Sequence, residues 1–361
     1  MKKILYINHR NKTKVLNNFL DALGPDTLLY GYNFFLSDNN FITDSINHCN
    51  KKRYLFLDFL CTRVFYRFYR LSFKLGLIFE NLKKINTFDI IFCSADGTLF
   101  PILLLKRIGL IKRNIKIFGA SIGLINNING PCRKALIIWL LKRADSVIVY
   151  SLSEEKLFFD KLKLNNVKFI NPGIDINFFN GEKYCDNTIE RYVISIGNDS
   201  ERDYRNLITA WSEIYKEEND FNIKLKIITS QNIVLPIGDF GIEVINNKIT
   251  IKEIRNYYSK MLFGIVPLRK TLRSSGQIAV LSMLSMKKNV VTDTNNAGLK
   301  DLSQYEGVIN YDCENVDSLK KSIKKAIKLS EEKIFFYNRE FFINYSTKNL
   351  YKNLKVIFLK A

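Results

Sequence analysis

The 361-residue sequence has little histidine, no closely spaced cysteines and no long apolar run. Its two histidines, His9 and His48, are too few for a multi-histidine metal site. The six cysteines lie far apart without a C-x-x-C pair, a pattern typical of neither a zinc cage nor a disulfide framework, and one that fits a reducing cytosol. No run reaches the roughly 18 consecutive apolar residues of a spanning helix, so we expect none.

The sequence also has no secretory signal, no dinucleotide-binding fingerprint and no nucleic-acid recognition motif. After Lys2 and Lys3 comes an apolar stretch of only five residues, too short for a secretory signal, so we expect a cytoplasmic protein. No G-x-G-x-x-G fingerprint follows this first predicted strand, which weighs against a dinucleotide oxidoreductase. No nucleic-acid recognition motif or Arg/Gly-rich segment is present, so we expect no nucleic-acid partner.

What the sequence does have is positive charge. Its 55 Lys and Arg residues exceed its 35 Asp and Glu residues, for a net charge of +20. Residues 1–180 hold 27 basic and 13 acidic residues (+14), and residues 181–361 hold 28 and 22 (+6). This imbalance predicts an anionic partner, mainly for the first half.

Short β-branched or aromatic runs alternate with helix-like patterns along the chain. Examples are the strand-like run 88–94 and the helix-like run 206–216. Strands separated by helices predict parallel sheets covered on both faces, an α/β fold of two doubly wound halves. The polar stretch Asn180–Glu190 is the predicted linker, so we expect domains at residues 1–180 and 181–335.

Ligands of such folds bind where loops leave the carboxyl ends of the strands. In the first half these loops contain His9, Asp96 and Ser121, which we take as candidate catalytic residues. Asp96 is the carboxylate placed to accept a proton from a substrate hydroxyl, as a general base does. The alternative is that Asp96 and Gly97 form a plain turn.

In the second half, a predicted strand ends at Gly197 and is followed by Arg202 and Arg205 at the start of a helix. Glycine lets the backbone approach a ligand closely, and two guanidiniums at a helix N-terminus suit a diphosphate. The alternative is that both arginines pair with the adjacent acidic residues on a solvated turn.

A second loop combines cations and hydroxyls. It supplies Arg269, Lys270 and Arg273 before the segment Ser274–Gln277, which leads into a predicted helix. Free N–H groups at a helix start attract anions, so this loop predicts a phosphate site. An ordinary serine N-cap is the alternative, and one turn can serve both purposes.

Five segments in this order resemble the retaining GT-B glycosyltransferases of the "glycosyl transferases group 1" family. The resemblance covers about residues 140–300. The segments are Ala144–Ser151, Asn171–Asp175 with Phe178 and Phe179, Gly197 with the Arg202-Asp203-Tyr204 turn, Ser275-Gly276-Gln277, and Val290–Asp293.

The resemblance implies two Rossmann-like domains facing each other across a cleft, with residues 1–180 binding the acceptor and residues 181–335 binding a nucleotide-diphospho-sugar. It further implies that residues 336–361 return to the first domain, and that neither a metal nor another cofactor is needed. UDP is the favoured donor nucleotide and GDP the second. The implied donor-binding residues are Gly197, Arg202, Arg205, Arg273, Ser274, Ser275, Gly276, Gln277 and Ser282.

The sequence departs from the family at one pair of positions. Most members carry two Glu residues separated by seven others, where this chain has Ser274 and Ser282. A hydroxyl cannot supply the charge-assisted bond of a carboxylate. The implied function is a retaining transferase that builds surface polysaccharide, such as lipopolysaccharide O-antigen or capsule, on a glycan or polyprenyl-diphosphate-linked acceptor. The alternative is a non-catalytic pseudo-glycosyltransferase that binds a glycan or a partner subunit.

The basic first half contains a candidate membrane-binding helix over residues 60–78. Cations recur on one stripe at Arg63, Arg67, Arg70 and Lys74, with an aliphatic stripe and aromatic residues beside them. Such a helix can bury its aliphatic stripe and press cations onto the anionic inner face of the cytoplasmic membrane. Residues 106–116 add a second basic cluster. The alternative is a solvated basic face.

Overall fold

The computed structural model describes residues 1–69, 71–128, 130–184, 190–218, 221–296, 298–336 and 338–360. The chain forms two compact units. Unit 1 comprises Met1–Gly173 and Thr347–Ala361, and unit 2 comprises Ile174–Ser346. Arg70 lies outside the described residues. Residues 185–189, which are part of the expected linker, also lie outside them.

The two ends of unit 2 are tied to each other. The Ile174 N–H donates to the Tyr345 carbonyl at 2.7 Å, and Ile174 pairs with Ser346 in an isolated parallel bridge. The unit therefore begins at residue 174 and ends at residue 346, where the sequence predicted 181 and 335.

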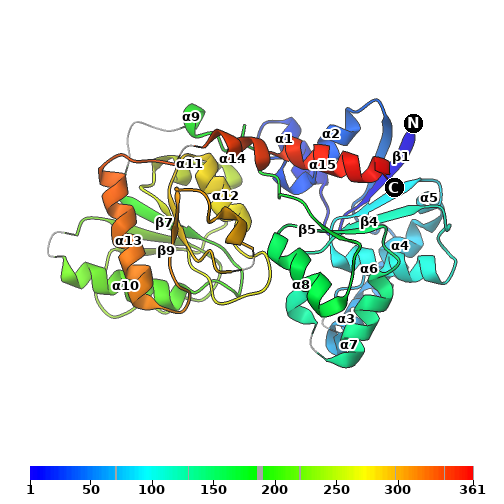
Figure 1. Ribbon diagram of the computed structural model, residues 1–361, viewed down its shortest axis with the longest axis horizontal. Coiled ribbons are helices and arrows are strands. Elements are labelled where there is room, and N and C mark those ends of the chain that lie inside the picture. The colour runs from blue at the N-terminus through cyan, green and yellow to red at the C-terminus, as the bar shows by residue number, and fades with distance from the viewer. Residues whose placement is uncertain are drawn as a thin grey trace. The chain divides into compact units, whose positions relative to one another are not determined.

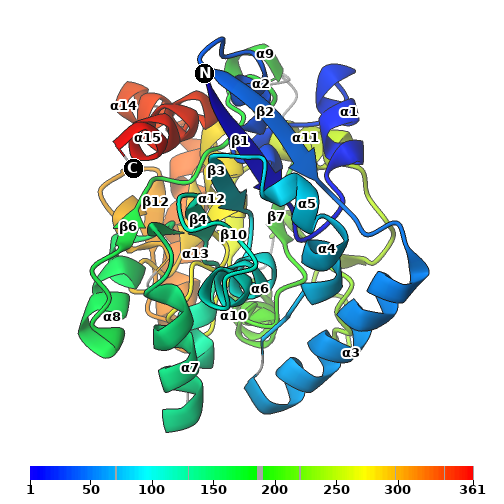
Figure 2. The ribbon, with the colours of Figure 1, turned by 90° about the vertical axis from the view of Figure 1, so that its right-hand side faces the viewer.

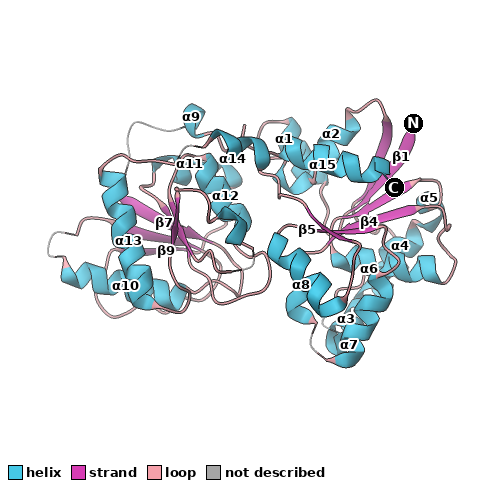
Figure 3. Cartoon of the chain, in the orientation of Figure 1, coloured by secondary structure: helices cyan, strands magenta, loops and turns pink. Residues whose placement is uncertain are grey.

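Unit 1 is built on one parallel sheet with strand order β2-β1-β3-β4-β5-β6 (Figures 1 and 3). Its central strands are short apolar runs buried on both faces, as β3 shows. The edge strand β2 has a mixed burial pattern and was not predicted. The strands are β1 (Lys2–Ile7), β2 (Phe41–Ile46), β3 (Ile90–Cys93), β4 (Lys116–Ala120), β5 (Ser146–Val149) and β6 (Val167–Phe169).

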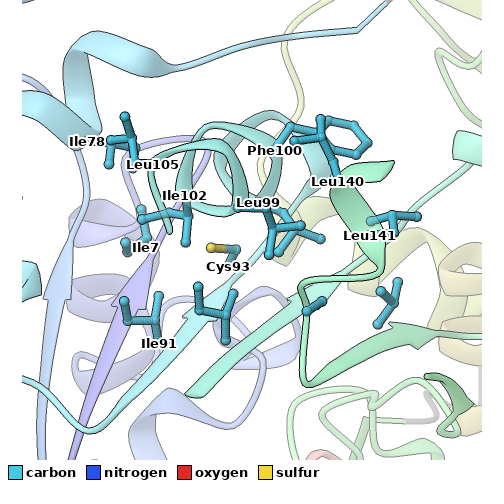
Figure 4. Close-up of a cluster of buried hydrophobic side chains, with 14 of the residues drawn as sticks. Ile7, Ile78, Ile91, Cys93, Leu99, Phe100, Ile102, Leu105, Leu140 and Leu141 are labelled. Atoms are coloured by element: carbon cyan, nitrogen blue, oxygen red, sulfur yellow. The ribbon is translucent and has the colours of Figure 1, made fainter. Parts of the chain in front are cut away.

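Helices cover both faces of this sheet. On one face, Leu99, Ile102 and Leu105 of α6 pack over the strands (Figure 4). On the other face, Leu354 and Phe358 of α15 join the core. The helices are α1 (Thr13–Leu20), η1 (Thr27–Leu29), α2 (Tyr32–Leu36), α3 (Lys52–Tyr69), α4 (Leu75–Glu80), α5 (Leu82–Ile85), α6 (Asp96–Arg107), η2 (Leu124–Asn127), α7 (Pro131–Leu141), α8 (Leu152–Leu162) and α15 (Thr347–Lys360).

The single helix predicted over residues 60–78 is wrong, because the chain breaks it into α3 and α4. Asp58 of α3 is buried and accepts hydrogen bonds from the N–H groups of Gly76 (2.5 Å) and Leu77 (3.2 Å), at the start of α4. A Cβ on Gly76 would overlap the Tyr54 carbonyl, so only glycine permits this close packing. Figure 2 shows α3 on the outside of unit 1.

Unit 2 has a second parallel sheet, with strand order β12-β11-β10-β7-β8-β9. Its strands are β7 (Tyr192–Ile196), β8 (Lys224–Ile228), β9 (Ile242–Ile245), β10 (Gly264–Val266), β11 (Val290–Thr292) and β12 (Val308–Asn310). Its helices are α9 (Gly181–Tyr184), α10 (Tyr204–Glu217), α11 (Ile251–Lys260), α12 (Gln277–Ser285), η3 (Lys300–Leu302), α13 (Val316–Glu331) and α14 (Arg339–Asn344).

One connection in unit 2 has no helix. α10 joins β7 to β8 and α11 joins β9 to β10, but residues 229–241 join β8 to β9 as a loop. Apolar side chains on this loop are exposed, Val234 by 91% and Ile237 by 102%. Among the residues that the structure describes, no helix is both long and apolar enough to cross a membrane.

Candidate functional site

The carboxyl edge of the unit 2 sheet has a topological switch point between β7 and β10. From β7 the chain continues to β8 and β9 on one side, and from β10 to β11 and β12 on the other. Loops that leave two such strands diverge and open a crevice, which is where open α/β sheets bind ligands. The loops after β7 and β10 contain most of the predicted donor-binding residues. Arg205 and Gln277 lie in the first turns of the helices that follow these loops, and Ser282 lies further along α12.

Arg202 lies buried between two glycines at this point. A Cβ on Gly197 would overlap the Arg202 guanidinium, and a Cβ on Gly276 would lie 2.8 Å from its Nη1. The backbone of Gly276 has φ +77°, a conformation that favours glycine. Arg202 is 5% exposed, and its Nε and Nη1 groups have no hydrogen-bond partner among the described residues.

The guanidinium of Arg202 is therefore a buried cation without an ion-paired partner among the described residues. No described residue forms an ion pair with Arg202 or Arg205, so the alternative of a solvated salt-bridged turn does not hold. Asp203 instead caps α10, accepting a hydrogen bond from the Asn206 N–H at 3.3 Å. Burial lowers the pKa of Arg202, against the opposing effects of Tyr204 and Asp199, but arginine stays protonated in proteins.

The neighbouring Arg273 is already paired. Its guanidinium contacts the Asp199 carboxylate and lies 3.9 Å from Glu201 Oε1. Ser275 Oγ also donates to Asp199, at 3.0 Å. Asp199 thus ties the loop after β7 to the loop after β10 and holds the predicted donor-binding residues Arg273 and Ser275.

The start of α12 differs from an ordinary serine cap. Its N-cap is Gly276, without a side-chain cap bond. Gln277 is 5% exposed and its amide donates to the Gly298 carbonyl at 3.0 Å. Ser282 Oγ donates to the Ile278 carbonyl within the helix, at 2.7 Å. Ser274 packs against Gly298, where a Cβ would overlap its backbone.

A pocket of about 480 Å³ adjoins Arg202. Arg202, Arg205 and Arg269 line it together with apolar groups of α10 and of loop 231–236. Its shape follows from the crossover without a helix, because the loop after β8 folds over the start of α10. The pocket therefore combines three cations with an apolar wall.

Sequence reasoning missed the residues that hold this edge together. Tyr204 Oη and Thr229 Oγ1 both donate to the Gly197 carbonyl, at 2.7 and 2.8 Å. Asn198 Oδ1 accepts from the Ser230 N–H at 2.6 Å. The loops after β7 and β8 each looked like ordinary turns in the sequence, and only strand adjacency brings them together.

In unit 1, the structure brings all three candidate catalytic residues close to the start of α6. β1, β3 and β4 are neighbours in the sheet, so His9, Asp96 and Ser121 follow three adjacent strands. Asp96 opens α6, with Ala95 as an extended N-cap. The His9 ring lies against Gly97, where a Cβ would be 2.7 Å from Nδ1.

Asp96 has an unusual electrostatic environment. Its Oδ1 is buried and forms no hydrogen bond with a described residue, and the same holds for the Oγ of Ser121. Burial raises the pKa of Asp96 to about 7, and Glu154 adds to this shift, whereas the nearby Ser121 hydroxyl and Ile122 N–H oppose it. Asp96 can therefore exchange a proton near neutral pH.

His9 is partly buried, and its backbone N–H donates to Ser94 Oγ at 3.1 Å. Its Nδ1 is buried without a partner among the described residues. Burial lowers the pKa of His9, and the charges of Lys74, Arg10 and Lys12 lower it further. The imidazole is therefore neutral at pH 7.

Lys74 belongs to this site and not to the exposed face of α3. Pro101 of α6 has no N–H to offer the Gly97 carbonyl, which accepts instead from the Lys74 N–H at 2.9 Å. Lys74 is thereby fixed beside His9. Of the predicted membrane-facing cations, Arg63 and Arg67 are exposed on α3, while Arg70 lies outside the described residues.

The second basic cluster is mostly engaged within unit 1. Lys106 and Lys116 pair with Asp145, at 3.5 and 3.3 Å. The Arg107 Nε donates to the Trp139 carbonyl at 3.1 Å. Within the described parts of the chain, no group of three or more His, Cys, Asp or Glu side chains is arranged to hold a metal ion.

No protein-family model matches the sequence, and no curated protein matches it either. Solved structures do match. Sucrose-phosphate synthase from Thermosynechococcus elongatus aligns over 100% of this chain and 99% of its own, with a TM-score of 0.68 and 12% identity. The UDP-forming α,α-trehalose-phosphate synthase from Burkholderia vietnamiensis aligns over 100% of both chains, with a TM-score of 0.68 and 9% identity.

HepE from Anabaena, solved with UDP and glucose, aligns over 100% of both chains with a TM-score of 0.65 and 11% identity. These likenesses extend over the whole chain and cover both six-stranded parallel sheets. The protein therefore has the α/β fold of the GT-B glycosyltransferases. At this level of identity the comparison establishes the fold.

Proposed function

We propose that the protein is a glycosyltransferase that uses a nucleotide-diphospho-sugar, with the donor in unit 2 and the acceptor in unit 1. The observation that carries this proposal is the buried, unpaired guanidinium of Arg202 between Gly197 and Gly276. A buried cation without a counter-ion is costly, and an anionic ligand at the switch point would compensate it.

In this proposal, the donor diphosphate accepts hydrogen bonds from Nε and Nη1 of Arg202. These charge-assisted bonds grow stronger as the diphosphate leaves, which lowers the barrier to glycosyl transfer. Arg205 and Arg269 add positive charge at the adjoining pocket. Cations would thus take the place of a metal ion. UDP is the first choice of nucleotide, since HepE was solved with UDP, and GDP is the second.

The carboxylate of Asp199 places a negative charge within the proposed donor site. It contacts the Arg273 guanidinium and accepts a hydrogen bond from Ser275. We infer that donor binding uses Arg202 first, and that Arg273 reaches the diphosphate only by leaving Asp199. The two serines at the family's Glu positions, Ser274 and Ser282, would contact the sugar and ribose through hydroxyls alone.

On the acceptor side, Asp96, His9 and Ser121 would contact the attacking hydroxyl. We propose retention of anomeric configuration, in which the acceptor attacks on the face that the diphosphate leaves. The raised pKa of Asp96 supports a second route, because a carboxylate that titrates near pH 7 suits the general base of an inverting enzyme. NMR of the product's anomeric proton decides between them. An inverted product that disappears with Asp96→Asn would contradict retention.

We further propose that α3 binds the anionic inner face of the cytoplasmic membrane, beside a polyprenyl-diphosphate-linked acceptor of surface polysaccharide synthesis. The aliphatic stripe of this helix was expected to be buried, but two of its residues, Leu60 and Val64, are exposed by 42% and 52%. Phe59 is exposed and lies under the Arg63 guanidinium, 6.0 Å from it. Apolar groups interleaved with cations suit an anionic bilayer surface.

The test is release of nucleoside diphosphate from a panel of UDP- and GDP-sugars by the purified protein. We expect slow hydrolysis of one donor, abolished by Arg202→Ala. Arg339→Ala, which removes an exposed cation of unit 2, is the matched control. Thermal-shift measurement with UDP and GDP shows binding separately from turnover. Binding without release of nucleotide would favour the alternative, a non-catalytic pseudo-glycosyltransferase. Neither binding nor release would refute both.

A further inference from the structure

Three cations lie near His9 in the candidate acceptor site of unit 1. Arg10 and Lys12 follow β1, and Lys74 is held beside Gly97 by its own backbone. None of the three forms an ion pair with a described carboxylate, although carboxylates elsewhere in unit 1 pair with Lys84, Lys106 and Lys355. Their charges are therefore available to a ligand.

Neighbouring groups fix the position of Lys12, whereas Arg10 is exposed. The Lys12 N–H donates to Asn47 Oδ1 at 3.3 Å, and Lys12 Nζ lies 5.6 Å from the centre of the Tyr30 ring. Lys12 is also the N-cap of α1, which has no side-chain cap and no acidic residue in its first turn. The Thr13 N–H donates to Asn11 Oδ1 at 2.9 Å, and the helix dipole adds partial positive charge at this end of α1.

A second, independent observation indicates that a ligand completes this site. Ser121 is 1% exposed, and its hydroxyl lies near the Asp96 carboxyl group but makes no close hydrogen bond with a described residue. Asp96 Oδ1 and His9 Nδ1 are likewise buried and unpartnered. An unsatisfied buried polar group costs about 1–3 kcal/mol, so three at one strand edge are typical of a binding site. The hydroxyls of a sugar could pair with all three.

We propose that the acceptor of this enzyme carries a phosphate group, which Arg10, Lys12 and Lys74 bind while Asp96, His9 and Ser121 contact its hydroxyls. This inference rests on the proposed function only in naming the ligand an acceptor. Three separate cations match a phosphate, which carries about −1.5 to −2 charges at pH 7, better than a carboxylate with one charge.

The chain provides a direct reporter of this anion. It has two histidines, so His48→Gln leaves His9 as the only imidazole in the NMR spectrum of the full-length protein. Burial lowers the pKa of His9 and the three cations lower it further, so we expect an anion bound by these cations to raise it. We expect 10 mM sodium phosphate to raise the pKa of His9 by at least about half a unit relative to sodium chloride at equal ionic strength.

Variants separate specific binding from general screening. The triple variant Arg10→Ala/Lys12→Ala/Lys74→Ala should raise the pKa of His9 without phosphate and abolish the response to it. Lys112→Ala, an exposed lysine elsewhere in unit 1, is the control and should leave both unchanged. If the triple variant does not fold, each single substitution should reduce the response in part. A response to phosphate no larger than that to chloride, or one that persists in the variants, would overturn the proposal.

Two further arms identify where the phosphate comes from. Glucose 1-phosphate tests a soluble sugar phosphate, and undecaprenyl phosphate in neutral detergent micelles tests a lipid phosphate. Tighter binding of either, by tenfold over inorganic phosphate, assigns the source, and equal binding of all three shows that the phosphate alone is recognised. Arg202→Ala should leave the His9 response intact. Loss of the phosphate response therefore refutes the acceptor proposal alone, whereas loss of UDP binding concerns the donor site.

Discussion

Units 1 and 2 both place polar side chains at the carboxyl edge of a parallel sheet, but they differ in the sign of the group that is left without an ion-paired partner. In unit 1, the carboxyl group of Asp96 is left without a cationic partner and titrates near pH 7. In unit 2, the carboxylate of Asp199 is paired and the cation of Arg202 is left alone. An unpaired buried acid is suited to moving a proton, and an unpaired buried guanidinium is suited to holding an anion. The same architecture thus supports two chemistries.

The largest effect is expected from a substitution at the carboxyl edge of the unit 2 sheet. Gly276→Val would place a side chain on Nη1 of Arg202 and on Val266, in a backbone conformation that valine avoids. Each charge-assisted hydrogen bond contributes about 1.5–3 kcal/mol, so losing Arg202 as a donor should weaken UDP binding at least about 100-fold by calorimetry. Gly109→Ala, also at positive φ but facing open space, is the control for backbone strain. Unchanged affinity would place the diphosphate elsewhere.

The second prediction concerns the unit 1 edge and its pH dependence. Folding raises the pKa of Asp96 from 3.8 to about 7, so the native state holds this proton more tightly than the unfolded state. The native state is therefore destabilised as the pH rises from about 4 to 7, because Asp96 must ionise while buried. Asp96→Asn removes that cost.

Asp96→Asn should accordingly raise the melting temperature by several degrees at pH 8 and leave it nearly unchanged at pH 4. Thermal unfolding followed by circular dichroism at both values measures this difference. Asp145→Asn, which removes a carboxylate paired with Lys106 and Lys116, should instead lower stability at pH 8. A stabilisation that does not depend on pH would mean that Asp96 titrates normally.

A smaller effect is expected at the surface of unit 1. Each basic group near an anionic membrane contributes about 1 kcal/mol, so Arg63→Ala/Arg67→Ala should weaken binding to phosphatidylglycerol liposomes about 30-fold at low salt. High salt should weaken binding of the unmodified protein in the same direction. The matched control is Lys321→Ala/Lys325→Ala, which removes two exposed lysines of α13 in unit 2. Equal loss in both double variants would indicate attraction through net charge alone.

The smallest effect is expected at Ser282. Its hydroxyl already donates to the Ile278 carbonyl within α12, so it gives up little to a ligand. Ser282→Ala should change UDP affinity by less than about threefold, in contrast to the family's Glu at this position. Isothermal titration of UDP measures it. A tenfold loss would show that the serine takes over the carboxylate's contact.

Sequence patterns predicted most of the fold for a definite physical reason. Strands buried on both faces are continuous apolar runs, so β1, β3 and β7 stand out in the sequence. β2 was missed because an edge strand with Thr43, Asp44 and Ser45 has no such run. The break between α3 and α4 was missed because it depends on Asp58, a residue from the preceding helix.

The candidate sites were predictable in part. Placing His9, Asp96 and Arg202 in loops required only strand ends, which the sequence marks. The pairing of Asp199 with Arg273 joins loops 74 residues apart, and no local pattern indicates it. Likewise, the isolation of Arg202 follows from the backbone conformation of Gly197 and Gly276, which is settled only when β7 and β10 lie side by side.

The position of α15 determines the order in which the two units can fold during synthesis. Leu350, Leu354 and Phe358 complete the core that Tyr6, Phe92 and Phe118 begin, so part of one face of the first sheet stays uncovered until α15 has left the ribosome. Unit 2 is continuous in sequence and can fold while unit 1 waits. A nascent chain stalled before residue 350 would expose this aromatic face and be prone to aggregate, even though its second sheet is complete.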